Sequence, residues 1–471
     1  MKKVFAMLLA LTMLVGMVGM TASADEVVTI KWVTVGSGMP TNYDAWAKQI
    51  NAYLEEKIGV HIDMEVIGWG DWDNRRNTIV NTNEPYDIIF GNDGTYVNDV
   101  QLGAYAEITE DMLKENAPGL LELIPAGYWD ACRVGGKIYA VPTYKDSSMT
   151  NYFVWDKDLL DANGLDASEA HDLTAIEPIL NALKDKTSDP VFPQNSNGAS
   201  YLLATYDSFS SGLPAIGVRF DDAEMKVVAA LEQADIMANL EILHKWYNEG
   251  LINADAATHA ESNKYNVCSV AQGWPSAAIT TWGPNMGVTA AAYQFGDTIV
   301  SNGTVQGSLN SISVNCAHPD KALAFLNLIN TDAYVRDSFY YGLEGDNWVY
   351  TEDGRVHKNN SEWTMAGYTQ GTFFQVTPTD DTDFNQWDEV KALNEVAKPS
   401  VLLGFFFDTT PVQDELASCI EIYNRYRGEV MTGTTDPAES VPQMMQEMRD
   451  AGFDTIVNEA QAQINTWKAG K

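Results

Sequence analysis

Basic residues are scarce in this sequence. Among its 471 residues, 29 Lys and Arg stand against 65 Asp and Glu, which gives a formal net charge of −36. A chain this acidic is repelled by phosphate backbones and by anionic lipid surfaces, so the charge argues against binding to nucleic acid or to such membranes. Acidic charge otherwise favours solubility and identifies no partner.

Cysteine and histidine are also rare. The four cysteines form no C-x-x-C pair and no metal-ligand spacing; they are Cys132, Cys268, Cys316 and Cys419. Disulfides and buried free thiols are both compatible with positions so far apart. The six histidines are scattered, and the acidic stretch at residues 379–390 does not fit the calcium loop of an EF-hand. We therefore expect no metal site and no cofactor.

Familiar catalytic motifs are missing as well. The chain has no H-E-x-x-H, no G-x-S-x-G and no glycine-rich loop of the kind that holds phosphates. A hydrolase that works with two carboxylates needs none of these motifs, and 65 acidic residues leave that class open.

Only one long hydrophobic run is present, at the very start. "MKK" precedes an apolar stretch shorter than the ~20 residues of a membrane span, and "TASADE" follows it. This pattern predicts a secretory signal peptide at residues 1–24, cleaved after Ala24, with an uncleaved anchor as the alternative. We expect a soluble, extracytoplasmic protein that is associated with the cell surface. No cysteine lies near the cleavage site, so the sequence does not support a lipid anchor.

The first part of the mature chain alternates strand and helix patterns. Strands are predicted at 27–35, 60–66 and 86–90, a helix over 43–58 and a shorter helix around 74–81. This order is the beginning of an open α/β sheet, in which ligands bind in loops beyond the carboxyl ends of the strands.

Three loops fall at that predicted edge. They read "GSGMPTN" (36–42), "GWGDWD" (68–73) and "GNDGTY" (91–96). Each is rich in small, polar or aromatic residues, so Trp69 and Trp72 are expected on the rim that faces a ligand.

Helical patterns dominate the later part of the chain. Their ranges are 231–250, the pair 318–330 and 332–342, and two closing helices at 436–452 and 454–470. Each closing helix begins at an aspartate, Asp436 or Asp454, that is expected to cap it, and ends at a glycine.

A resemblance appears at residues 135–165, "GGKIYAVPTYKDSSMTNYFVWDKDLLDANGL". Together with 84–108, 318–345, 398–412 and the closing helices, this block resembles the extracellular solute-binding proteins of carbohydrate-type ABC importers. The last two blocks are most similar to lipoprotein-type members from Gram-positive bacteria. Those members carry a lipobox cysteine where this sequence has "GMTASAD", so its retention at the surface is left open.

The resemblance implies a two-lobed α/β fold like that of periplasmic binding proteins, with a hinge of crossing segments and a helical C-terminal region. The first lobe is expected from residues 25–147 with 305–345, and the second from 148–304 with 346–471. The chain is expected to cross between the lobes near 146–150, 301–309 and 345–375.

The same resemblance places the ligand between the lobes. Aromatic rings suit the apolar faces of a sugar, and carboxylates and amides suit its hydroxyls. The expected ligand-binding residues are Trp69, Trp72, Asn92, Asp93, Tyr144, Asp146, Trp274, Trp282, Tyr341, Glu344 and Phe406. Of the three consecutive rings at 405–407, one or two are expected in the core, because alternate residues of an extended segment face opposite sides.

The implied function is capture of an oligosaccharide and its delivery to the permease of an ABC importer. We expect a monomer with no catalytic activity and no catalytic residues. The alternatives are a secreted carbohydrate-active hydrolase, and the same binding fold with a peptide or another small solute as its ligand.

Overall fold

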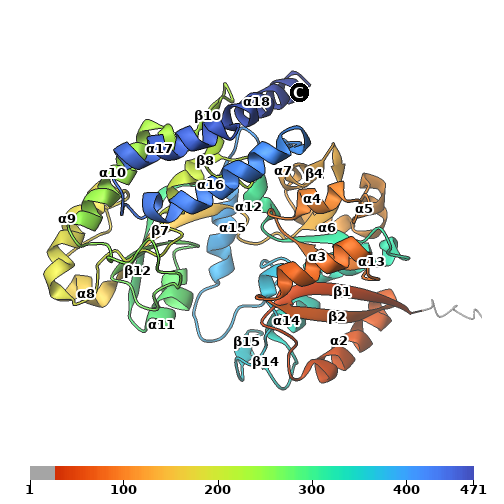
Figure 1. Cartoon of the computed structure of the whole chain (residues 1–471). Coiled ribbons are helices and arrows are strands. Elements are labelled where there is room, and N and C mark those ends of the chain that lie inside the picture. Colours follow the sequence, from red (N-terminus) through yellow and green to blue (C-terminus); the bar gives the residue numbers. More distant parts are fainter. Residues whose placement is uncertain (1–26, 471) are drawn as a thin grey trace, which may run out of the picture.

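The computed structural model describes residues 27–470 (Figure 1). The predicted signal peptide at 1–24 lies outside these residues. Within the described part of the chain, no helix is long and apolar enough to cross a membrane.

The first lobe is built on a five-stranded sheet. Its order is β2 (Val60–Gly68), β1 (Val28–Gly36), β3 (Ile88–Gly91), β13 (Leu309–Ile312) and β6 (Ala140–Pro142). β1 pairs in parallel with β2 and β3, while β13 runs antiparallel to both of its neighbours. The predicted βαβαβ beginning of an α/β sheet is confirmed.

Two helices lie on opposite sides of β1 and β2 (Figure 1). α2 (Tyr43–Ile58) buries Trp46, Ile50 and Leu54, and it ends at Gly59, whose φ of 64° is the left-handed conformation that glycine adopts without strain. α3 (Trp72–Thr82) begins two residues earlier than predicted. α13 (Pro319–Thr331) and α14 (Ala333–Tyr341) add to this lobe, where Phe325 and Phe339 pack on Trp32 of β1.

The second lobe contains a four-stranded and a three-stranded sheet. The first has the order β11 (Cys268–Gln272), β7 (Met149–Asp156), β12 (Ala290–Val300) and β16 (Lys398–Pro399). The second has the order β10 (Val227–Ala229), β9 (Ile216–Arg219) and β8 (Tyr206–Asp207). Four long helices complete the lobe: α10 (Ala234–Asn248), α16 (Gln413–Met431), α17 (Pro437–Asp450) and α18 (Phe453–Ala469).

One predicted helix start is wrong. Asp436 caps α17 as expected, because its carboxylate accepts a hydrogen bond from the Ala438 amide. α18 instead begins from Gly452, whose φ of 101° turns the chain sharply between the two helices. Asp454 therefore lies in the first turn of α18 rather than at its cap.

The chain passes between the lobes three times. It does so at 143–148 between β6 and β7, and through α12 (Asn302–Gln306) between β12 and β13. The third passage comes later than predicted, through α15 (Gln386–Val396) into β16. The reason is that 364–365 still belongs to the first sheet: the Ser37 amide bonds to the Thr364 carbonyl, and Met365 is buried in the core of that lobe.

Some of the buried side chains between residues 341 and 390 form a small third cluster around Trp348 and Trp387, with the hairpin of β14 (Trp348–Tyr350) and β15 (Val356–Lys358). The remaining α-helices and strands are α4 (Tyr96–Gln101), α5 (Glu110–Asn116), α6 (Pro118–Leu123), α7 (Ala126–Ala131), β4 (Arg133–Val134), β5 (Lys137–Ile138), α8 (Lys157–Ala162), α9 (Leu173–Leu183) and α11 (Gly283–Met286).

All four cysteines are free thiols, and all but Cys316 are buried.

Candidate functional site

The carboxyl ends of β1, β2 and β3 share one edge of the first sheet. The register sets Gly36 opposite Gly68, and β3 runs parallel to β1 on its other side. The three loops singled out in the sequence therefore meet along this edge, between the two lobes.

The two tryptophans of "GWGDWD" have different environments. Trp69 is 52 % exposed, and its ring lies parallel to that of Tyr368, with 6.1 Å between centroids and 12° between planes. Trp72 is 5 % exposed and packs on Phe90, because it is the first residue of α3 and faces the sheet. Of the two, Trp69 alone offers a free aromatic face.

Tyr368 was not predicted from the sequence. Its carbonyl accepts a hydrogen bond from the Ser308 hydroxyl. The fully buried Arg336 donates to the carbonyls of Gly367 and Thr372, each at 2.7 Å. These bonds fix the segment that carries the Tyr368 ring to the body of the first lobe. Only the tertiary fold brings it to Trp69, so no local sequence signal could have identified it.

An ion pair lies beside this aromatic pair. Lys145 Nζ is 2.6 Å from Asp146 Oδ1 and 5.5 Å from the centre of the Tyr368 ring. Burial raises the pKa of Tyr340 to about 12, and the carboxylate of Asp146 also acts to raise it. Burial and the same carboxylate raise the pKa of Tyr368. Asp146 is thus placed to influence two tyrosines of one surface, and Lys145 is a second residue that the sequence did not indicate.

Tyr144, two residues before Asp146, lies in the packed hinge region. Only 6 % of it is exposed, and its ring lies between those of Tyr128 and Phe374. Asn394 of α15 secures the segment that follows, because its side chain bonds the Ser148 amide and the Lys145 carbonyl.

The second lobe contributes two half-buried tryptophans. Trp274 packs on Trp387 of α15, with 5.7 Å between centroids, and Trp282 packs on Tyr152 of β7 at 5.9 Å. Gly273 is required here, because a Cβ at that position would lie 2.7 Å from the Trp282 ring. The segment 274–282 is therefore built tightly against its own lobe.

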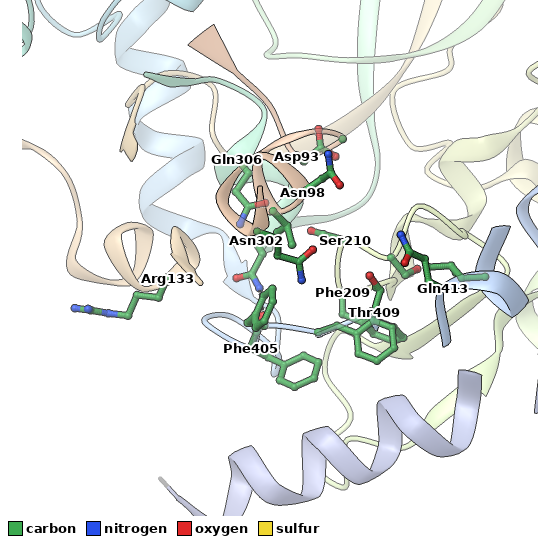
Figure 2. Close-up of a pocket in the computed structure, with 17 residues that line it drawn as sticks. Asp93, Asn98, Arg133, Phe209, Ser210, Asn302, Gln306, Phe405, Thr409 and Gln413 are labelled. Atoms are coloured by element: carbon green, nitrogen blue, oxygen red, sulfur yellow. Dashed lines mark hydrogen bonds between the residues drawn. The ribbon is translucent and has the colours of Figure 1, made fainter. Parts of the chain in front are cut away.

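A hollow of about 130 Å³ lies near α12 and is lined from both lobes (Figure 2). Asp93 stays exposed at one side of it, with no ion-pair partner within residues 27–470, and crowding by neighbouring atoms raises the pKa of its carboxyl. Asn92 forms the turn before Asp93, since its side-chain oxygen accepts a hydrogen bond from the Gly94 amide. The Oε1 atom of buried Gln306 lacks a partner among the described residues, whereas Arg133 points away.

The three consecutive phenylalanines divide as predicted. Phe405 and Phe407 are buried in the second-lobe core, while the half-buried Phe406 packs against the first-lobe core. Phe406 also lines the hollow that contains Asp93.

Two predicted residues lie away from these surfaces. Tyr341 is buried in the third cluster, where its hydroxyl donates to the Thr377 carbonyl at 2.6 Å. Glu344 lies against α2, where its backbone exchanges hydrogen bonds with Gln49. The structure does not bring either of them to Trp69.

Two sequence families match the chain. Residues 36–336 match the family described as bacterial extracellular solute-binding protein, and residues 401–469 match a domain family of unknown function. A curated protein from Streptococcus pneumoniae, named carbohydrate ABC transporter substrate-binding protein, is 28 % identical in an alignment of 467 residues that covers 96 % of this chain and 93 % of that one.

The fold is similar to crystal structures of the N-glycan transport solute binding protein of Streptococcus pneumoniae. The structure described without a sugar has a TM-score of 0.86 at 27 % identity, covering 94 % of this chain and 100 % of the other. The complex with Man1GlcNAc has a TM-score of 0.76 at 26 % identity, covering 92 % and 98 %. The complex with Man5GlcNAc has a TM-score of 0.75 at 27 % identity, covering 94 % and 99 %.

Proposed function

The chain belongs to the bacterial extracellular solute-binding protein family, and we propose that it captures an oligosaccharide between its lobes for an ABC importer. The observation that carries the proposal is the parallel pair of Trp69 and Tyr368 at the edge of the first sheet. An exposed indole beside a second aromatic ring is a surface for the apolar face of a sugar.

Polar groups around this pair suit the hydroxyls of such a ligand. Asp146 lies beside Tyr368, while Asp93 lines the separate hollow near α12 and has no ion-pair partner within residues 27–470. Carboxylates accept hydrogen bonds from hydroxyls, while the ammonium of Lys145 and the phenol groups donate them. A sugar held between rings and these groups is both stacked and oriented.

We propose that the lobes close on the ligand. The chain is more similar to the relative's structure described without a sugar than to the two sugar complexes, although identity and coverage are nearly the same. Two lobes joined by three narrow passages are the usual architecture for hinge closure. The described fold then corresponds to an open state.

The protein is proposed to act outside the cytoplasm as a monomer and to deliver its ligand to a membrane permease. Its relative from Streptococcus pneumoniae is named as a carbohydrate ABC transporter substrate-binding protein. We propose that this chain likewise binds its sugar without converting it, against the alternative of a hydrolase with two carboxylates. Since Asp93 has no cationic partner within 27–470, a peptide or other ammonium-bearing solute is the second alternative.

A thermal-shift screen tests the proposal. The panel contains Man1GlcNAc, Man5GlcNAc, other neutral oligosaccharides and short peptides. We expect a neutral oligosaccharide to raise the melting temperature and to be recovered unchanged by chromatography after long incubation. Stabilisation by peptides alone would overturn the sugar assignment, and recovery of cleaved sugar would move the protein to the hydrolases.

A further inference from the structure

A second hollow, of about 300 Å³, lies between the lobes at the amino-terminal end of α15. Its lining comes from the π-helical turn Ala278–Trp282 of the second lobe, from α14 and from the loop that leads into α15. π-Helical turns are rare and occur frequently at functional sites.

Two apolar side chains face this hollow without a hydrophobic core around them. Ile279, on the π-helical turn, is 63 % exposed, and Phe384, in the loop before α15, is half-buried. Neither belongs to any of the hydrophobic clusters of residues 27–470. They line one space from two different segments, which is the arrangement that a flat ligand with an apolar face needs.

Hydrogen-bond donors line the same space. The Tyr340 hydroxyl and the Lys358 ammonium group have no hydrogen-bond or ion-pair partner in the described chain. The Thr280 hydroxyl donates to Gln386 Oε1 at 2.9 Å, so that two lining residues tie the turn to α15. The hollow thus combines apolar walls with free donors, as a sugar site does.

Tyr340, which lines the hollow, connects it to the Trp69–Tyr368 pair. Gly367 separates the two tyrosines: it precedes Tyr368 in the chain, and a Cβ on it would lie 2.4 Å from the Tyr340 ring. Asp146 acts on the hydroxyls of both Tyr340 and Tyr368. A ligand stacked at Tyr368 can therefore continue past Asp146 into the second hollow.

We propose that this hollow is a second sugar subsite, which takes an additional ring of a longer glycan and makes the protein select for chain length. The inference rests on the proposed function. A volume of about 300 Å³ is at the lower end for ligand pockets, so it suits one terminal part of a chain rather than a whole oligosaccharide. Short glycans would then be bound at Trp69 alone, and longer ones at both places.

Titration calorimetry with Man1GlcNAc and Man5GlcNAc tests the subsite. Wild-type protein should bind the longer glycan at least about tenfold more tightly, and Ile279→Ser and Phe384→Ala should each remove most of this preference. The affinity for Man1GlcNAc should stay unchanged in both variants. Because Ile279 is mostly exposed, its replacement should leave the melting temperature as it was.

Val314→Ser is the matched control. Val314 is 52 % exposed and follows β13 at the end of the sheet away from the cleft, so its loss should change neither affinity. Equal wild-type affinities for the two glycans, or variants with the wild-type preference, would overturn the subsite alone. Wild-type protein that binds neither glycan would also overturn the subsite. The thermal-shift panel of oligosaccharides and peptides would then test separately whether the protein binds sugars at all.

Discussion

The rings of Trp69 and Tyr368 lie almost parallel, 12° apart with 6.1 Å between centroids, although they come from distant parts of the chain. Trp69 extends from the loop after β2. Tyr368 is held in place by two hydrogen bonds: Ser308 donates to the Tyr368 carbonyl, and Arg336 donates to the carbonyl of the preceding Gly367. One ring is therefore exposed on a loop and the other is anchored in the lobe. This division leads to separate predictions for affinity and for stability.

Trp72→Ala should destabilise the protein while leaving sugar binding intact. Its ring is buried against Phe90, and truncating a buried tryptophan costs about 3–5 kcal/mol through lost contacts and the cavity left behind. Denaturant unfolding measures this cost, and calorimetry below the melting transition measures affinity. An unchanged unfolding midpoint together with weaker binding would show that Trp72 contacts the ligand instead.

Arg336→Met should weaken both folding and binding. It would leave the buried carbonyl of Thr372 without its donor, at about 1–3 kcal/mol, and would remove one of the two donors to the Gly367 carbonyl, which would release the segment that holds Tyr368. We expect a lower melting temperature and, in protein that is still folded, a lower affinity. Trp72→Ala is the control, since it should lose stability without losing affinity. Full affinity in folded Arg336→Met would refute the positioning role.

The buried carboxyl of Asp337 should make stability depend on pH. Burial raises its pKa, so the folded protein holds this proton more tightly than the unfolded chain, whose pKa is about 3.9. The stabilising contribution of this group is present below about pH 4 and is lost as pH rises through the folded pKa.

Asp337→Asn should remove that part of the pH dependence. The asparagine oxygen can still accept the Thr377 amide, which now bonds to the carboxylate at 2.8 Å. Unfolding free energies measured from pH 4 upward should therefore fall less steeply in the variant than in the wild type. If the unfolding free energies of the wild type and the variant instead changed with pH in parallel, Asp337 would have the same pKa in the folded and unfolded protein.

Ligand binding should make the molecule more compact. Small-angle scattering should give a smaller radius of gyration with the sugar than without it, as the lobes rotate about the three passages. A ligand at 100 times its dissociation constant should also add about 2.7 kcal/mol of stability by mass action. Stabilisation with an unchanged radius would mean that the free protein is already closed.

Local patterns in the sequence were sufficient for much of the fold. Apolar residues spaced along 43–58 predicted α2, and Gly59 ends it in the left-handed conformation as expected. The alternation of Phe405, Phe406 and Phe407 between two cores also followed from the geometry of an extended segment.

Long-range contacts could not be predicted in this way. Tyr368 reaches the site only because the segment after the β14–β15 hairpin returns to the first sheet, which also moved the third passage to α15, and its ring there meets Lys145 of the first passage. The difference between Trp69 and Trp72 depended on where α3 begins, within one turn of "GWGDWD". At such a junction, one residue decides whether a ring faces the core or the cleft.

Calorimetric titration of Trp69→Ala with the sugar that best stabilises the wild type tests the central proposal most directly. Because Trp69 is half-exposed on a loop, the variant should keep the wild-type melting temperature. Its affinity should fall more than tenfold, since truncating an aromatic anchor typically costs about 2 kcal/mol or more. Wild-type affinity in this variant would contradict the account, because the sugar would then bind without the Trp69–Tyr368 pair.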